Sequence, residues 1–194
     1  MKKLSVLLCI FLLSACAPSE VPSEKLVERN GIKYEINSQT PFTGFSTVYY
    51  ENGQLEKKVT YKDGVKNGPS EYYHENGQLQ FRVTYKDGKL NGITEDYREN
   101  GQLRTKSTYK DGKLNGITED YRENGQLRLK KTFKDGERNG IIEFYRENGQ
   151  LFSKGTYKDG RLHGLWESYD ENGQEKGPPV CYKNDEEADI SKCK

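Results

Sequence analysis

The sequence has little hydrophobic material and few of the residue types that build enzyme or metal sites. Only 32% of its 194 residues are hydrophobic, the mean hydropathy is −1.02, and there are two histidines. The formal net charge of +1 leaves no basic footprint for nucleic acid. His74 and His163 lie far apart in the chain, so they favour neither a nucleophilic nor a metal site. We therefore expect no enzyme activity, no metal and no cofactor.

Low hydrophobicity is also typical of disordered chains, but the spacing of the aromatic residues indicates a folded array. The twenty glycines and fourteen tyrosines recur at fixed intervals rather than being scattered. Disordered chains usually lack aromatic residues, and self-similarity at a fixed period is the signature of repeat proteins.

The first fifteen residues, 1–15, have the features of an export signal. Lys2 and Lys3 precede an apolar stretch at 4–13, which is too short to span a bilayer, and Leu-Ser-Ala-Cys follows at 13–16. Small residues before a cysteine resemble the lipobox of bacterial lipoprotein precursors. This resemblance implies cleavage before Cys16 and acylation of that cysteine, giving a stable anchor in a lipid bilayer. An ordinary signal peptide with an incidental Cys16 is the alternative.

The resemblance also predicts a location in the bacterial cell envelope. Ala17, rather than an acidic residue, follows Cys16. The sorting rule for lipoproteins of two-membrane bacteria then implies the periplasmic face of the outer membrane. In a cell with one membrane, the same anchor would hold the protein on the outer surface.

The rest of the chain divides into three parts. Residues 16–25 are rich in Pro, Ser and Glu and are interpreted as a lipidated tether, 26–177 as the repeat domain and 178–194 as a C-terminal tail. In an oxidising compartment we expect a disulfide between Cys181 and Cys193, closing a short loop and contributing roughly 3 kcal/mol. A redox or metal-binding pair is the alternative.

The repeat has a period of 24 residues and reads as a chain of β-hairpins. A thirteen-residue segment at 92–104 recurs unchanged at 116–128. Units contain Glu-Asn-Gly and, in all but the last, Lys-Asp-Gly, and such Asn-Gly and Asp-Gly pairs between alternating segments are strong hairpin signals. Each unit opens with one of the glycines Gly44, Gly68, Gly92, Gly116, Gly140 and Gly164. The fold class expected is all-β: a single-layer antiparallel meander, forming a curled open sheet.

The parity of the apolar residues predicts the turn type at Glu-Asn-Gly. Leu79, Phe81, Val83 and Tyr85 after one turn are odd-numbered, as is Tyr97 before the next. A three-residue loop would keep odd residues opposite odd residues, so we predict a type I turn closed by a bulge with left-handed glycine. The expected register pairs Tyr97 with Leu103, and every odd residue would then share one face.

Two rows on that face are candidates for binding a partner. Carboxylates placed among apolar residues are costly when buried and unpaired. Either the face is partly hydrated, or the two rows line a groove for a basic or extended segment of another protein. The acidic row is Glu71, Glu95, Glu119, Glu143 and Glu167, and the aromatic row is Tyr73, Tyr97, Tyr121, Tyr145 and Tyr169. A row of loop aspartates, including Asp87 and Asp111, is better explained by turn formation than by calcium, because neighbours lie ~10 Å apart.

These motifs resemble a known repeat. The spacing Tyr-x-x-Gly-x-x-x-Gly, as at 109–116, is similar to the MORN repeat, and Asn-Gly-Gln-Leu with Lys-Asp-Gly-x-x-Asn-Gly is similar to bacterial MORN variants of the YwqK-type antitoxin family. The segment 29–44 also looks like that family's lead-in hairpin. The resemblance implies neutralisation of a toxin by binding, although this chain carries an export signal.

Together these features predict a non-enzymatic, membrane-anchored repeat scaffold. It would bind a protein or envelope partner through its Tyr/Leu/Glu face, and the alternative is an antitoxin or immunity-type protein that neutralises a toxin directly. A sheet this wide cannot leave a large apolar face bare, so the face must be covered by curling, by dimerisation or by a partner. The sequence leaves the oligomeric state open.

Overall fold

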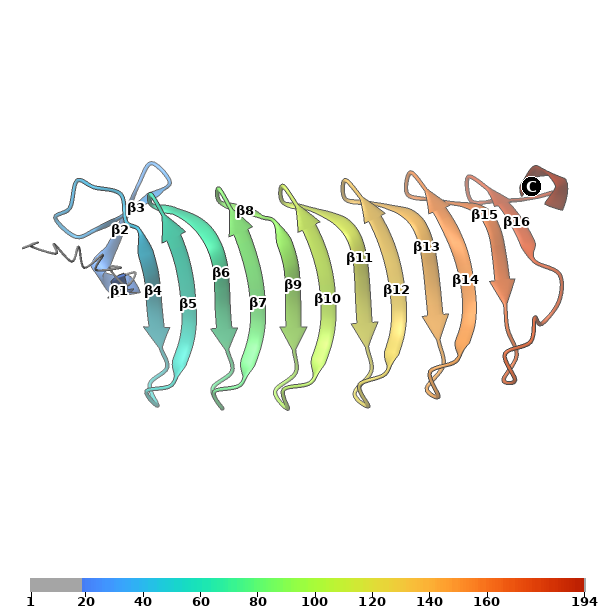
Figure 1. Ribbon diagram of the computed structural model, residues 1–194, viewed down its shortest axis with the longest axis horizontal. Helices are drawn as coiled ribbons and strands as arrows, with labels where there is room; N and C mark the ends of the chain where they lie inside the picture. Colours follow the sequence, from blue (N-terminus) through green and yellow to red (C-terminus); the bar gives the residue numbers. More distant parts are fainter. Residues whose placement is uncertain (1–18, 194) are drawn as a thin grey trace, which may run out of the picture.

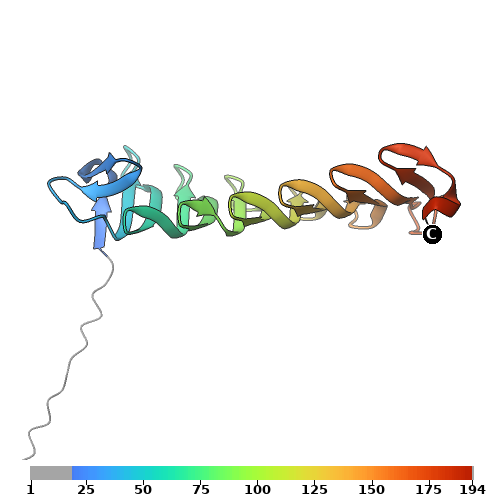
Figure 2. The same ribbon diagram turned by 90° about the horizontal axis from the view of Figure 1, so that it is seen from above.

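The computed structural model describes residues 19–193 and shows one long, twisted, single-layer sheet. Successive strands are neighbours in a 15-stranded sheet, so the chain advances one hairpin at a time along the long axis (Figure 1). Figure 2 shows that the band of strands twists along its length, as L-amino acids dictate. The expected all-β open meander is confirmed.

The repeats supply most of the strands of this sheet. They are β4 (Gly44–Tyr49), β5 (Leu55–Lys62), β6 (Val65–Tyr73), β7 (Leu79–Lys86), β8 (Lys89–Leu90), β9 (Gly92–Tyr97), β10 (Leu103–Lys110), β11 (Lys113–Tyr121), β12 (Leu127–Lys134), β13 (Glu137–Tyr145), β14 (Leu151–Lys158) and β15 (Arg161–Ser168). Three further strands complete the sheet at its two ends: β1 (Ser19–Pro22), β16 (Val180–Lys183) and β17 (Glu186–Ala188). Two short 3-10 helices, η1 (Ser23–Lys25) and η2 (Ile190–Cys193), flank them.

Two kinds of turn alternate along the sheet. At Glu-Asn-Gly, the backbones of Arg98 and Gln102 close a three-residue loop in which Gly101 is left-handed (φ 79°), as the parity argument predicted. The Asn100 side chain accepts a hydrogen bond from the Gln102 amide and stabilises this loop. At Lys-Asp-Gly the loop has two residues, and Asp111 adopts a φ of 52°, as a type I′ turn requires.

A bulge after each loop overturns the expectation that all odd residues share one face. Leu103 pairs with Tyr97 as predicted, but the next pair is Thr105 with Asp96, so the register shifts by one residue at Arg104. Beyond the bulge, odd residues of β10 pair with even residues of β9 and share a face of the sheet with them. The same shift separates Leu79 from Phe81, Val83 and Tyr85, which belong to the opposite face.

The odd residues displaced by the bulge join even residues of the neighbouring strands to build the core, on a side that we call the inner face. Its central row is defined by the register, and its members run across the sheet: Ser46, Val59, Ser70, Val83, Thr94, Ser107, Thr118, Lys131, Ile142 and Gly155. Val59 and Ser70 are 0% exposed and Val83 is 1% exposed. Burying a valine side chain stabilises a fold by roughly 1.5–3 kcal/mol, so Val59 and Val83 each contribute on that order.

The N-terminal edge corrects the interpretation of residues 16–25 as a tether. β1 pairs in parallel with β4, and Val21 packs into a cluster with Phe42, Val59 and Tyr61. The packing of Val21 therefore orders residues 19–25. Residues 16–18, including Cys16, lie outside the described residues. The lead-in segment forms a separate hairpin of β2 (Leu26–Arg29) and β3 (Ile32–Glu35).

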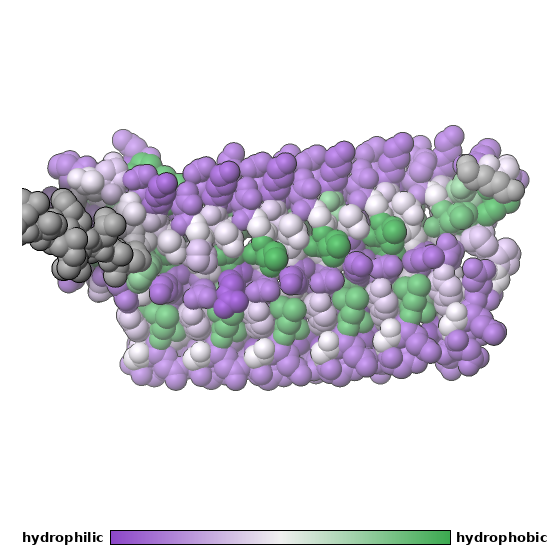
Figure 3. Space-filling view, in the orientation of Figure 1, coloured by the Kyte–Doolittle hydropathy of each residue, from purple (hydrophilic) through white to green (hydrophobic). Residues whose placement is uncertain are grey.

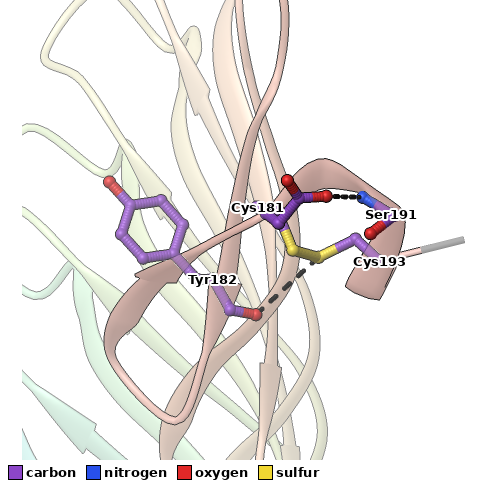
Figure 4. The surroundings of a disulfide bond; sticks show 5 residues. Cys181, Tyr182, Ser191 and Cys193 are labelled. Atoms are coloured by element: carbon purple, nitrogen blue, oxygen red, sulfur yellow. Dashed lines mark hydrogen bonds between the residues drawn. A yellow bond between two sulfur atoms is a disulfide. The ribbon is translucent and has the colours of Figure 1, made fainter.

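The C-terminal segment extends the sheet instead of hanging from it as a tail. β16 pairs with β15 and β17 pairs with β16, so two strands cover the last repeat. A disulfide joins Cys181 to Cys193, as expected from the sequence (Figure 4). Cys181 is 2% exposed, and the bond fastens η2 against β16. Both ends of the array are thus closed by non-repeat segments, which is typical of repeat proteins.

Candidate functional site

The second side of the sheet, which we call the open face, carries three rows that run across the strands. In the last four repeats, the segment before the Glu-Asn-Gly turn supplies an aliphatic residue, a glutamate and a tyrosine at alternate positions, for example Ile117, Glu119 and Tyr121. Figure 3 views this side as two apolar rows separated by a hydrophilic row. Ile93, Ile117 and Ile141 are 47%, 44% and 53% exposed, so the aliphatic row is open to solvent.

Every tyrosine of the predicted row is held by the glutamate two residues before it. The hydroxyl of Tyr73 donates to Glu71 at 2.9 Å, that of Tyr121 to Glu119 at 3.0 Å and that of Tyr145 to Glu143 at 3.1 Å; Tyr97 and Tyr169 bind Glu95 and Glu167 likewise. The two predicted rows are therefore brought together.

These contacts change the acidity of the tyrosines. Burial, followed by the hydrogen bond to Glu119 and the charge of that carboxylate, raises the pKa of Tyr121 to about 12. The same causes raise the pKa of Tyr73 and of Tyr145 to about 12. Neutral phenols that donate to carboxylates fix the tyrosine rings in one orientation along the face.

The sequence reasoning missed the basic partners of the glutamates. Because of the bulge, even-numbered Lys106 lies directly opposite Glu95 on one side and Glu119 on the other. The register repeats this arrangement and produces a strictly alternating row of ten charges, which we call the charge ladder: Lys58, Glu71, Arg82, Glu95, Lys106, Glu119, Lys130, Glu143, Lys154 and Glu167. The bulge explains why the basic residues were missed, because without it the even-numbered bases would lie on the face opposite the glutamates.

The side chains of the ladder form several ion pairs. Arg82 contacts Glu71 at 3.1 Å and Glu95 at 3.5 Å, and Lys154 contacts Glu167 at 2.8 Å. Hydrogen bonds from Lys154 and Tyr169 lower the pKa of the Glu167 carboxyl. Arg82 is 45% exposed and Glu95 19% exposed, so water screens these pairs and each contributes little stability. Their effect is to neutralise the acidic row and to impose a regular charge pattern.

Other polar side chains connect one repeat to the next. Arg98 and Arg122 donate to the backbone carbonyls of Tyr121 and Tyr145, which lie 23 residues further along the chain. At the opposite edge, the Asn115 side chain donates to Asp135 at 3.2 Å. The loop aspartates thus serve turn formation and repeat stacking.

Within residues 19–193, no group of three or more His, Cys, Asp or Glu side chains is arranged to hold a metal ion. His74 Nε2 donates to the Tyr97 carbonyl, 3.2 Å away, and His74 lies in a different repeat from His163. No helix in this part of the chain is both long and apolar enough to cross a bilayer. The arrangement offers extended contact surfaces.

Similarity to solved structures is distant. A mutant of S. aureus TarM in complex with fondaparinux, alpha-GlcNAc-glycerol and UDP aligns with 9% identity and a TM-score of 0.34, over 50% of this chain and 19% of TarM. The accessory secretory proteins 1, 2 and 3 of Streptococcus pneumoniae align with 12% identity and a TM-score of 0.32, over 66% of this chain and 21% of the matched chain. The chain thus spans about a fifth of these structures. No curated protein matches.

The family is established by the repeats themselves. The MORN repeat variant matches six successive segments: 44–63, 66–87, 90–111, 114–135, 138–159 and 162–174. Together they cover more than half of the chain, and most begin near the Lys-Asp-Gly turn and contain the glutamate, the tyrosine and the Glu-Asn-Gly loop described above. The chain belongs to the family of MORN repeat variant proteins.

Proposed function

We propose that the protein is a non-enzymatic scaffold, anchored to a membrane of the bacterial envelope through acylated Cys16, that docks another protein on its open face. MORN repeats are generally modules that bind proteins or membranes. The single observation that carries the proposal is the exposure of the aliphatic row, with Ile93, Ile117 and Ile141 each more than 40% exposed beside an ordered row of tyrosines.

The chemistry of the open face defines the partner. A row of free glutamates would favour a basic segment, but five basic side chains lie opposite the glutamates and remove that preference. Aliphatic and aromatic rows on either side of a neutral ladder instead favour a flat or extended protein surface with apolar side chains and both signs of charge. Tyrosines add large contact area at low entropic cost.

The position of the proposed anchor gives the array an orientation. Cys16 precedes the first ordered strand, which begins at Ser19, by three residues. Three residues span at most about 10 Å, so an acylated Cys16 would hold the β1 edge of the sheet close to the lipid headgroups. The repeats would then extend from that edge as a rigid platform.

The anchor is tested by fatty-acid labelling of cells that produce the full chain. We expect an alkyne-bearing fatty acid to label the wild type and Cys16→Ala to abolish both labelling and membrane fractionation. Cys181→Ala, in the C-terminal cap, is the matched cysteine control and should leave both unchanged. Labelling that persists in Cys16→Ala would contradict the lipid anchor.

The docking face is tested by a photo-crosslinking amino acid at Ile117 in living cells. We expect a discrete protein adduct from this position and none from Lys110, an exposed residue at the end of β10 that serves as control. Mass spectrometry of the adduct identifies the partner, and a toxin encoded beside this gene would reveal the antitoxin form of the function. Absence of adducts from Ile93, Ile117 and Ile141 alike would contradict docking on this face.

A further inference from the structure

We infer that the partner seated on the open face is a second copy of this chain, related by a two-fold axis that lies between β10 and β11 and runs parallel to the strands. The inference rests on the proposed function, because it names the occupant of the same face. Its basis is the charge ladder, whose order makes the face complementary to itself.

The complementarity follows from the number and alternation of the charges. The ladder begins with a base, Lys58, and ends with an acid, Glu167, and its ten members alternate without a break. A two-fold axis at its centre reverses the order in the second copy, so the first position meets the tenth. Lys106 then faces the partner's Glu119, and Glu119 faces the partner's Lys106. All ten positions meet the opposite sign.

The flanking rows match under the same operation. Strands that carry glutamate also carry the large residues Ile117 and Tyr121, whereas strands that carry a base carry Thr108 and Leu103. Reversal therefore places Ile117 opposite the partner's Thr108, and Tyr121 opposite the partner's Leu103. Large side chains meet smaller ones in both rows, which is the alternation that lets two sheets interdigitate about 10 Å apart.

The area and the symmetry both suit a dimer. Three rows extend about 14 Å along the strands and ten strands extend about 45 Å across them, roughly 600 Å² on each copy. A stable interface uses about 800 Å² per partner at the standard size, so the face falls within the usual range for weaker dimers. A two-fold contact of this kind is closed, because each copy offers the same patch to the other and no unpaired patch is left to propagate into filaments.

The arrangement has a consequence for membrane attachment. Reversal of the long axis places the two β1 edges at opposite ends of the dimer, and each edge is three residues from its own Cys16. The sheet has fourteen strand positions from β1 to β17, so the anchors would be roughly 60 Å apart. A doubly anchored dimer would lie along the bilayer.

The test uses charge reversal in two differently tagged full-length copies that are produced together and purified from detergent-solubilised membranes. We expect wild-type copies to co-purify. Lys106→Glu paired with itself, and Glu119→Lys paired with itself, should each lose at least tenfold in co-purification, because two like-charge contacts form across the axis. Lys106→Glu mixed with Glu119→Lys should recover pairing, because both contacts regain opposite signs.

The mixed pair separates self-association from folding. Each chain has the same altered neighbours within its own sheet whether it is mixed or alone, so a folding defect would persist in the mixture. Lys110→Glu, at the exposed end of β10 and outside the ladder, is the control and should co-purify like the wild type. Failure of the mixed pair to recover, or wild-type copies that do not co-purify, would overturn the inference. If Ile117 then still crosslinked a different protein, the proposed docking function would stand without the dimer.

Discussion

The inner and open faces of this sheet are made by the same strands, yet they serve different purposes. The inner face buries small residues in its central row, with Val59, Ser70 and Val83 at 0–1% exposure. The open face leaves Ile93, Ile117 and Ile141 about half exposed and orders its polar side chains in the charge ladder. A single layer can therefore hold itself together on one side and remain available for binding on the other.

The largest difference between the faces should appear when a charge is added to each. Val83→Asp places an unpaired carboxylate in the centre of the inner face and should lower the free energy of unfolding by more than about 3 kcal/mol. Thr84→Asp, one residue later on the open face, should change it by less than about 1 kcal/mol. Urea denaturation followed by circular dichroism measures both. Equal losses would contradict the assignment of the core to the inner face.

A smaller effect is expected from added volume on the inner face. A Cβ at Gly155 would lie 2.2 Å from Cε3 of Trp166, so Gly155→Ala forces the indole to move and should cost about 1–3 kcal/mol. Ser107→Ala, at the equivalent position two repeats earlier, adds no volume and is the control. Thermal unfolding of the two variants compares them, and an unchanged midpoint for Gly155→Ala would show that this site is not packed.

The hydrogen bonds of the open face should be detectable in the pH titration of its tyrosines. The pKa of Tyr73, Tyr121 and Tyr145 is raised to about 12, from the usual value near 10. A raised pKa means that these contacts contribute stability fully below pH 10 and lose it as the pH rises through 12. Tyrosinate absorbance should therefore show a late phase. A single transition near pH 10 would contradict the Tyr–Glu contacts.

The smallest effect should come from neutralising one glutamate of the ladder. Glu119→Gln removes the carboxylate that accepts from Tyr121 and should shift the pKa of that tyrosine downward, while burial keeps it above the ordinary value. Stability should change by less than about 1 kcal/mol, because the site is partly exposed. Tyr121→Phe identifies the titration phase of this residue. An unchanged late phase in Glu119→Gln would argue against the hydrogen bond as a cause.

Much of this comparison could be predicted from local sequence signals. Asn-Gly, Asp-Gly and the 24-residue period determine the hairpins, the three-residue loop at Gly101 and the pair of Tyr97 with Leu103. These features depend on backbone conformation over a few residues, where glycine and asparagine have strong preferences. The presence of glutamate and tyrosine on one face follows from their spacing within a single strand.

The sequence could not show in the same way which residues of the opposing strand share each face. The bulge at Arg104 has no glycine to mark it, and one extra residue exchanges the faces of everything that follows. It moves Val83 into the core and brings Lys106 beside Glu95 and Glu119. The order of residues 19–25 was also missed, because the burial of Val21 depends on contacts with residues distant in the chain.

The most direct test of the shifted register is a pair of engineered disulfides across β11 and β12. In the bulged register Glu119 lies opposite Lys130, whereas an unbroken register from Tyr121 and Leu127 would place it opposite Leu129. Peptide mass spectrometry of the oxidised variants should find a disulfide in Glu119→Cys/Lys130→Cys and none in Glu119→Cys/Leu129→Cys, whose side chains lie on opposite faces. The reverse result would contradict the charge ladder and the division between the two faces.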